Sequence, residues 1–225
     1  VREMLEQVEQ GTSGHYQLHL GLAGQERWFD VSLSTSDGVS GLQVIMVFRD
    51  VTERVRQQHS RRAQLYLLEN SKHWSMGQLL RETLDQVGEL TGSPIGFYHF
   101  VNESEGTLSL QMWSTATLQH FCRIGGQSGA TYAIAEGGVW LDCLRQRQTV
   151  IHNSYADLTQ KRGIPEGHAP VIRELVVPVL RGDVIVALLG VGNKPEEYTE
   201  QDVETVAVLA DLAWDIAERK RAEEA

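Results

Sequence analysis

The chain has 225 residues, of which 41% are hydrophobic and 22% are charged, and its formal net charge is −10. This length holds one full domain of roughly 150 residues together with part of a second domain. An acidic chain with a pI near 5.3 is poorly suited to bind nucleic acid or an anionic lipid surface. The composition therefore argues against both classes of partner.

The sequence predicts no membrane-spanning helix in this segment. Its longest uncharged apolar run, Val184–Val191, is far shorter than the ~20 residues that cross a bilayer. The segment 1–3 does not begin a signal peptide. Cys122 and Cys143 form neither a CxxC motif nor a disulfide framework, which favours a reducing compartment. We therefore expect a cytoplasmic protein, and membrane anchoring of a longer parent stays open.

Residues 1–50 are predicted to form part of a β-sheet. A helical piece over 1–10 precedes three expected strands, which are His15–Leu22, Glu26–Thr35 and Leu42–Asp50. Gly24 and the pair Asp37-Gly38 mark the turns between them. Three strands hold together only against a partner surface, so this segment is too small for a core of its own.

Residues 51–91 indicate one long helix or two stacked helices. Their first half is polar, and the second half carries an apolar face formed by Leu80, Leu84, Val87 and Leu90. Gly92 and Pro94 end the helical pattern.

From Pro94 onwards, helices and strands alternate in the predicted order. Strands are expected at Ile95–Val101, Leu108–Trp113, Tyr132–Ile134, Thr149–His152, Glu174–Leu180 and Val184–Gly192. Helices are expected at Thr115–Cys122 and Gly138–Arg147. A long loop over 153–170 is more typical of a functional segment than of a simple connection.

The last helix is predicted to begin after Thr199, with Thr199 as the N-cap and Asp202 at position N3 of a variant capping box. Its apolar stripe consists of Val206, Leu209, Ala213 and Ile216. The helix runs into the charged segment 218–225 with no Gly or Pro stop, so we expect it to connect to an output region beyond Ala225.

Residues 80–217 resemble a GAF domain over their whole length. The resemblance rests on the segments Ile95–Phe100, Ala135–Trp140, Pro165–Pro170, Leu175–Val179 and Gly192–Lys194. It is greatest with the GAF domains of bacterial and archaeal multidomain sensor kinases. The implied fold class is α+β, an antiparallel sheet flanked by helices.

Residues 15–55 resemble the last strands of a PAS domain and its exit into a signalling helix, Phe48–Arg54. The domain organisation that follows is the C-terminal part of a PAS domain over 1–50, a helical linker over 51–79, a GAF domain over 80–217 and the start of an output linker over 218–225.

The residues Asn193, Lys194, Tyr198 and Asp202 resemble the NK-F-D motif of cyclic-nucleotide-binding GAF domains, with Tyr in place of Phe. The alternative is a structural ion pair between Lys194 and Asp202 that holds the last helix. The nearby Gly190-x-Gly192 is expected to be a glycine pair at a site of tight packing, because no GK[ST] follows it.

A ligand pocket is expected among aromatic and polar residues of the GAF domain. The candidates are Trp113, Phe121, Cys122, Tyr132, Trp140, His152, Tyr155 and His168. Some methanogen redox-sensing kinases that resemble this chain hold haem in a GAF domain through a cysteine and an axial histidine. By that resemblance Cys122 and His168 are the possible haem ligands, although an unreactive cysteine and a loop-bound histidine are the alternative. No other metal site is expected.

The resemblance implies a non-catalytic sensory module that signals through its flanking helices to a downstream histidine kinase, as part of a two-component phosphorelay. A homodimer through these helices and a small-molecule ligand are expected. The alternatives are the sensory part of a diguanylate cyclase or phosphodiesterase, and a dimerisation or spacer domain without a ligand.

Overall fold

The computed structural model describes residues 14–22, 25–38, 41–121, 131–158 and 170–224. The chain divides into two compact units, Val1–His59 and Ser60–Ala225. Helix α2, Thr52–Asn70, runs across the boundary between them. The predicted helix over 1–10 lies outside the described residues.

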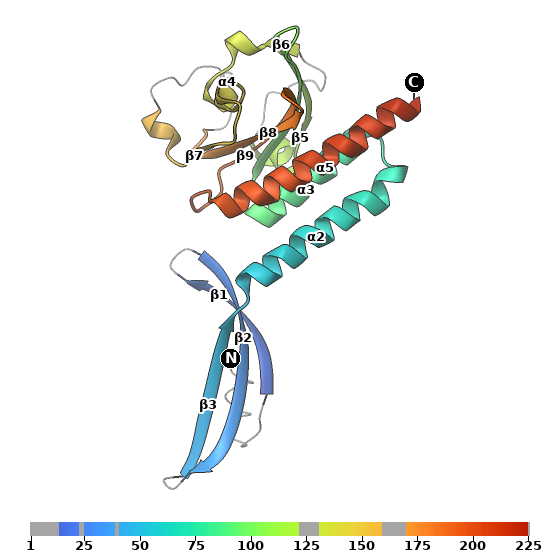
Figure 1. Cartoon of the computed structure of the whole chain (residues 1–225). Coiled ribbons are helices and arrows are strands. Elements are labelled where there is room, and N and C mark those ends of the chain that lie inside the picture. Colours follow the sequence, from blue (N-terminus) through green and yellow to red (C-terminus); the bar gives the residue numbers. More distant parts are fainter. Residues whose placement is uncertain (1–13, 23–24, 39–40, 122–130, 159–169, 225) are drawn as a thin grey trace. The chain divides into compact units, whose positions relative to one another are not determined.

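The first unit contains a three-stranded antiparallel sheet in the order β1-β2-β3 (Figure 1). Its strands are β1 Gly14–Leu22, β2 Gln25–Gly38 and β3 Gly41–Asp50. The three strands predicted from the sequence are confirmed, and β2 is longer at its C-terminal end than expected.

One face of this sheet is apolar. Val31 lies opposite Tyr16 on β1 and opposite Phe48 on β3, and residues directly opposite in a sheet share a face. Val31 and Leu33 are buried, whereas Phe48 is 54% exposed. On the apolar face, therefore, residues of the central strand β2 are buried, whereas Phe48 on the edge strand β3 stays exposed.

The second unit is built on a six-stranded antiparallel sheet with the strand order β6-β5-β4-β9-β8-β7. The strands are β4 Ile95–Asn102, β5 Thr107–Trp113, β6 Thr131–Ala133, β7 Val150–His152, β8 Glu174–Arg181 and β9 Val184–Gly192. Among the described residues its α-helices, besides the end of α2, are α3 Met76–Thr91, α4 Asp142–Gln146 and α5 Glu200–Glu224. This architecture confirms the α+β prediction.

The long helical segment is two helices, α2 and α3, separated by the short 3-10 helix η1 at Ser71–His73. Helix α3 begins with a capping box, in which Ser75 Oγ accepts from Gln78 N and Gln78 Oε1 accepts from Ser75 N. It ends at Gly92, which has a left-handed φ of 67° as predicted for a glycine stop.

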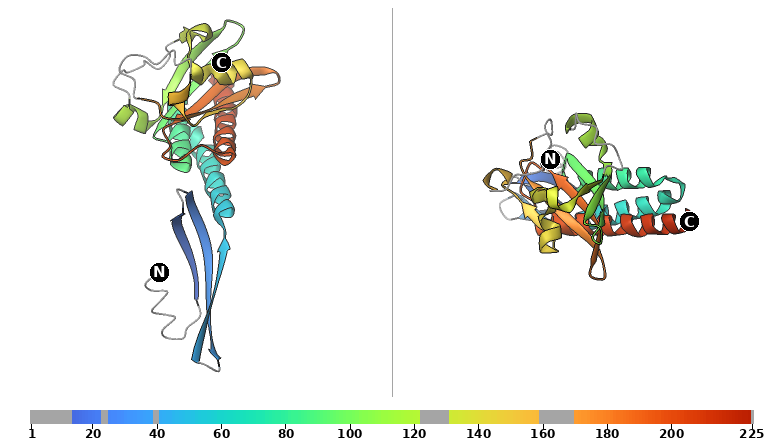
Figure 2. Two further views of the ribbon diagram at one scale, coloured as in Figure 1. Left: turned by 90° about the vertical axis from the view of Figure 1, so that its left-hand side faces the viewer. Right: turned by 90° about the horizontal axis from the view of Figure 1, so that it is seen from above.

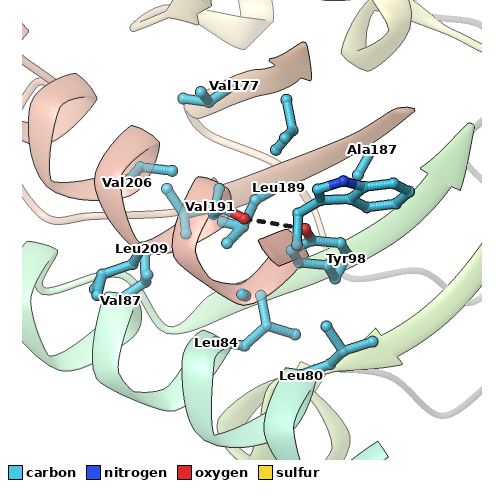
Figure 3. Packing of buried hydrophobic residues seen from close by; sticks show 14 of the residues in the cluster. Leu80, Leu84, Val87, Tyr98, Val177, Ala187, Leu189, Val191, Val206 and Leu209 are labelled. Carbon is cyan, nitrogen blue, oxygen red and sulfur yellow. Dashed lines mark hydrogen bonds between the residues drawn. The ribbon is translucent and has the colours of Figure 1, made fainter. Parts of the chain in front are cut away.

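Helices α3 and α5 lie side by side on one face of the large sheet (Figure 2). Their apolar residues interlock with those of β4, β8 and β9 (Figure 3). Tyr98, which is fully buried in this core, donates a hydrogen bond from Oη to the Ala210 carbonyl of α5 at 3.1 Å. The predicted stripe of Val206, Leu209, Ala213 and Ile216 is buried here, which confirms it.

A second, smaller core covers the opposite face of the sheet. Leu141, Cys143 and Leu144, from η4 (Val139–Leu141) and α4, pack on Val176 and Leu188. Because side chains alternate along a strand, β4 contributes Tyr98 and Phe100 to the helical face and Phe97 and Val101 to this one. None of the described helices is long and apolar enough to cross a membrane.

Candidate functional site

Four aromatic side chains gather on the sheet face opposite α3 and α5. Phe97 is central. The centroid of its ring lies 6.0 Å from the ring centroid of Trp113, 5.9 Å from that of Trp140 and 5.3 Å from that of His99. His99 also lies 5.1 Å from Trp140. We call these four residues the aromatic cluster. The cluster contains two of the predicted pocket residues, Trp113 and Trp140. Its other two members, Phe97 and His99, were not among the predicted pocket residues.

The local structure explains this arrangement. Trp113 lies directly opposite Phe97 in the register of β4 and β5, and Trp140 comes from η4, just before α4. His99 is 3% exposed, and burial lowers its pKa to about 3. His99 is therefore a neutral imidazole at physiological pH, while Phe97, Trp113 and Trp140 remain partly exposed. The cluster is therefore an uncharged group of rings on this face of the sheet.

A polar group lies on the same side of the sheet, where β7 pairs with β8. His152 Nδ1 is 2.8 Å from Glu174 Oε1, and His152 Nε2 is 3.7 Å from Asp142 Oδ2. Arg145 pairs with the other oxygen of Asp142 at 2.6 Å. Tyr155 is buried, and burial together with the charge of Glu174 raises its pKa to about 12. His152 and Tyr155 were both pocket candidates, and both lie close to Glu174.

We expect the stability contributed by His152 to depend on pH. Its hydrogen bond to Glu174 raises its pKa above the ordinary value near 6.5. Stabilisation by the protonated imidazole is fully present below the unfolded pKa, and it is lost as pH rises through the folded pKa. Urea unfolding should therefore show that His152→Gln is more destabilising at about pH 5 than at about pH 9. An equal loss at both pH values would contradict a protonated His152–Glu174 pair.

The proposed haem ligands, Cys122 and His168, lie outside the described residues. Phe121 ends the π-helical turn η2, Thr117–Phe121, and Tyr132 belongs to β6, but their side chains are also outside the described part. The other cysteine, Cys143, is buried, and burial raises its pKa to about 12. Cys143 is thus a protonated core residue and a poor ligand or nucleophile.

The residues of the Asn193–Asp202 motif lie just before α5 and in its first turn. We call this region the entrance of α5. Lys194 Nζ is 2.8 Å from both carboxylate oxygens of Asp202, so the predicted ion pair is present. Asp202 also accepts from Thr199 N at 2.8 Å. The capping box is only half formed, because the Thr199 hydroxyl donates to Asp202 and does not cap the helix backbone. The carboxylate of Asp202 therefore serves as both ion-pair partner and cap.

Three side chains connect this region to the two ends of the segment between β7 and β8. Asn153 donates to Tyr198 O at 3.0 Å and accepts from Tyr198 N at 2.7 Å. Asn193 accepts from Ile172 N at 2.7 Å and donates to Pro170 O at 2.9 Å. Arg173 Nη1 donates to Lys194 O at 2.7 Å. We call Asn153, Arg173 and Asn193, with these hydrogen bonds, the coupling network.

The network also clarifies the role of the tyrosine in the motif. Tyr198 is buried, and its hydroxyl is 2.8 Å from Ser93 Oγ, beyond the end of α3. Burial raises the pKa of Tyr198, so its hydroxyl stays protonated and can donate. A phenylalanine at this position would lack that hydrogen bond. Within the described part of the chain, no group of three or more His, Cys, Asp or Glu side chains could hold a metal ion.

Sequence reasoning missed the centre of the aromatic cluster. Phe97 and His99 belong to a strand that is apolar on both faces, so its periodicity marks neither residue as exceptional. The available signal was the glycine at 190, on the strand that pairs with Phe97. A glycine inside an apolar strand often indicates that something approaches the backbone closely.

The architecture and the sequence define the family together. The family described as GAF domain matches residues 75–218, and this chain belongs to it. A related protein from Methanosarcina acetivorans, described as a methyl sulfide methyltransferase-associated sensor, is 33% identical over 189 residues. The match covers 81% of this chain but only 19% of that relative, so the chain spans about a fifth of its length.

Solved structures with the same fold have much lower identity. The GAF domain of an Acinetobacter phosphoenolpyruvate-protein phosphotransferase has a TM-score of 0.61 at 15% identity, covering 75% of this chain and 95% of that chain. The chromophore-binding domain of a bacteriophytochrome from R. palustris has a TM-score of 0.53 at 12% identity. It covers 98% of this chain and 80% of that chain. These likenesses concern the fold alone.

Proposed function

We propose that this chain is a non-catalytic sensory module, in which a small ligand binds beside the aromatic cluster and the signal leaves through α5. The observation that carries the proposal is the paired hydrogen bond between the Asn153 side chain and the Tyr198 backbone. Asn153 follows His152, which belongs to the polar group on the ligand side. Tyr198 lies two residues before the start of α5. A change at His152 therefore reaches the start of the output helix through the neighbouring Asn153 and its two hydrogen bonds to Tyr198.

A ligand shifts the position of α5 only to the extent that it binds two arrangements of the module with different affinity. The coupling network supplies a physical means for such a difference. Movement of the loop ends would lengthen or break bonds at Tyr198, Asn193 and Lys194, all of which precede α5. The aromatic cluster itself can remain intact while these bonds change.

Replacing Asn153 by alanine is expected to uncouple the two regions. Metal-free protoporphyrin IX is a suitable planar probe, followed by its fluorescence. Wild-type protein should bind it and show reduced amide exchange at the start of α5, whereas Asn153→Ala should bind it with little change in exchange there. The matched control is Ser154→Ala, because Ser154 Oγ bonds Asp157 rather than the entrance of α5. Equal protection of α5 in wild type and Asn153→Ala would overturn the proposed route.

Haem is the ligand that the sequence resemblance favours. Support comes from the partly exposed rings of Phe97, Trp113 and Trp140, which lie together on one face of the sheet. Cys122 and His168 would hold it, and when bound it would report redox state or a diatomic gas. We expect a Soret band after reconstitution that shifts on reduction and is altered in Cys122→Ala and His168→Ala. A spectrum unchanged in both variants would exclude these residues as ligands.

The parent protein is proposed to be a cytoplasmic sensor histidine kinase acting in a two-component phosphorelay. Support comes from the relative described as a sensor, of which this chain matches about a fifth. A diguanylate cyclase or phosphodiesterase parent would use the same kind of input module. The coding sequence that adjoins this segment in the parent gene distinguishes them, because only a kinase parent carries a phosphoacceptor histidine and an ATP-binding domain.

Homodimerisation through the flanking helices is also proposed. Leu65 and Leu68 on α2 are 56% and 40% exposed, and Val208 on α5 is 43% exposed. These residues extend the helices' apolar surface beyond what the sheet covers. Light scattering at high micromolar concentration should report twice the monomer mass. A strict monomer would contradict the dimer, and a dimer without any bound probe would favour the ligand-free spacer role.

We further propose that residues 14–50 are the last three strands of a PAS domain. The supporting observation is that Phe48 and Met46 are about half exposed on the face that carries the buried Val31 and Leu33. The bacteriophytochrome likeness, which spans 98% of the chain, includes a fold counterpart for this region. Phe48→Ser should leave the parent's PAS region less resistant to proteolysis if that face is a PAS core. Unchanged resistance would contradict the assignment.

A further inference from the structure

Helix α5 continues beyond the part that packs on the sheet. Ala213, Ile216 and Ala217 are buried in the core that α5 shares with α3 and the sheet, whereas no residue described after Ala217 is buried. The charged segment 218–225 is nevertheless helical up to Glu224. Helix ends fray when little holds them. The contacts of this exposed segment therefore decide how firmly the output end of α5 is held.

Arg221 makes the first of these contacts. Its Cζ atom lies 4.0 Å from the ring centroid of Phe100 and 5.6 Å from that of Trp214. The two rings meet edge to face with their centroids 5.5 Å apart, and the two residues are only 9% and 8% exposed. A guanidinium over the face of a largely buried ring gains cation–π attraction, and its stem covers apolar surface. Arg221 thus covers the edge of the core and joins α5 to β4.

Lys220 makes the second contact. Its Nζ donates a hydrogen bond to the Trp74 carbonyl at 2.8 Å. Trp74 lies between η1 and α3, so this bond connects α5 to the junction of the two preceding helices. Neighbouring side chains on a helix point about 100° apart, which lets Lys220 and Arg221 reach two different elements. We call these two side chains, with their contacts to Trp74, Phe100 and Trp214, the latch.

The turns of α5 before the latch have a separate attachment. Arg181, at the end of β8, donates from Nη1 to Asp211 Oδ1 at 2.6 Å and pairs through Nη2 with Asp215. Two carboxylates four residues apart on a helix repel each other, and Arg181 between them compensates for this repulsion. This attachment holds α5 as far as Asp215, so loss of the latch should loosen only the part that follows.

The latched arrangement leaves one polar group of Trp214 unsatisfied. Its Nε1 is buried and has no hydrogen-bond partner among the residues that the structure describes. A buried donor without a partner is unfavourable relative to the same donor in water. Because Arg221 lies over the same ring, its release would bring water closer to this donor. The penalty at Nε1 offsets part of the gain from Arg221, which brings the latched and released arrangements closer in free energy.

We propose that Lys220 and Arg221 form a releasable latch that sets what fraction of the time the output end of α5 is docked on the sheet. This inference rests on the proposed sensory function, in which α5 carries the signal, and adds a point of regulation at the exit of that helix. With the latch closed, the end of α5 has one fixed direction relative to β4 and α3. With the latch open, the segment after Asp215 can take another direction while the core stays intact.

The test is amide exchange along α5 in Arg221→Gln, with Arg219→Gln as the matched control. Both variants lose one positive charge in the same part of the helix, so their effects on net charge and on the helix dipole are similar. Arg219, however, pairs with Glu223 on the exposed surface, at 3.8 Å. We expect Arg221→Gln to raise exchange after Asp215 by about three- to ten-fold. The control should raise it by less than about two-fold, and the urea midpoint should change little in either variant.

Further variants test the individual contacts. In a Phe100→Leu background, Arg221→Gln should have a much smaller effect than in wild type, because the ring beneath the guanidinium is gone. Acrylamide quenching should show greater exposure of Trp214 in Arg221→Gln, with Trp214→Phe identifying the contribution of that residue. Lys220→Met should also raise exchange near the end of α5, since it removes the bond to the Trp74 carbonyl.

The outcomes separate the latch from the proposed function. Equal exchange in Arg221→Gln and Arg219→Gln, or an undiminished effect of Arg221→Gln in the Phe100→Leu background, would show that the latch does not exist. A uniform rise along α5 that follows a lower urea midpoint would show that Arg221 stabilises the whole unit, which also overturns the latch. These results leave untouched the hydrogen bonds of Asn153 at the start of α5, so the sensory proposal stands or fails by its own test.

Discussion

Replacing Asp202 by alanine is expected to lower the free energy of unfolding by about 2–4 kcal/mol, and the melting temperature by roughly 5–15 °C. The side chains of Lys194 and Asp202 are only 17% and 11% exposed, so removing one charge leaves the other largely buried without its partner. The same substitution removes the acceptor for Thr199 N at the start of α5. Thermal unfolding followed by circular dichroism measures the effect.

The charge and the cap can be separated by variants at both positions. Lys194→Met removes the ion pair but keeps the bond from Thr199 N, so it should be less destabilising than Asp202→Ala. Glu204→Ala serves as a control, because it is an exposed acidic residue on the same helix. A loss below about 0.5 kcal/mol for Asp202→Ala, as is common for surface substitutions, would contradict its role in fixing α5.

Most elements of the second unit, Ser60–Ala225, were predictable because each has a local signal. The hairpin of β8 and β9 follows from two apolar runs around a short polar turn that contains Gly182, whose φ is 60°. The end of α3 follows from Gly92. The start of α3 also has a local signal, since Ser75 and Gln78 have capping-box spacing, but the expected helical segment over 51–91 did not use it.

The candidate site was less predictable because its contacts join residues that are distant in sequence. Strand pairing places Phe97 opposite Gly190, whereas Trp140 approaches Phe97 from η4. Asn153 and Tyr198 meet outside the strands, and the pattern of a single strand reveals none of these contacts. Trp113 and Trp140 were identifiable as large aromatic residues in the right region. Nothing local distinguishes Asn153 from any other polar loop residue, although it makes two bonds to the entrance of α5.

The two cores of the second unit suggest that stability and ligand binding can be changed separately. The core under α3 and α5 and the core under α4 lie on opposite faces of one sheet. The aromatic cluster shares its face with the smaller core. A cavity made on the helical face should therefore loosen α5 without removing any contact of the cluster.

Leu84→Ala makes such a cavity and is expected to cost about 2–5 kcal/mol in free energy of unfolding. Leu84 is fully buried between α3 and the sheet, in the same cluster as Leu209 of α5. Leu90→Ala is the matched control on the same helix, and it should cost less because Leu90 is only partly buried. Urea unfolding of both variants gives the comparison.

The same variants should separate stability from binding. Under conditions in which Leu84→Ala is still folded, its affinity for protoporphyrin IX should stay within about two- to three-fold of wild type, because Phe97, Trp113 and Trp140 do not belong to the core under α3 and α5. Amide exchange along α5 should nevertheless increase, since the helix loses packing beneath it. A loss of porphyrin binding that parallels the loss of stability would show that the two faces of the sheet form one cooperative unit, and it would place the ligand site under the control of the α3–α5 core.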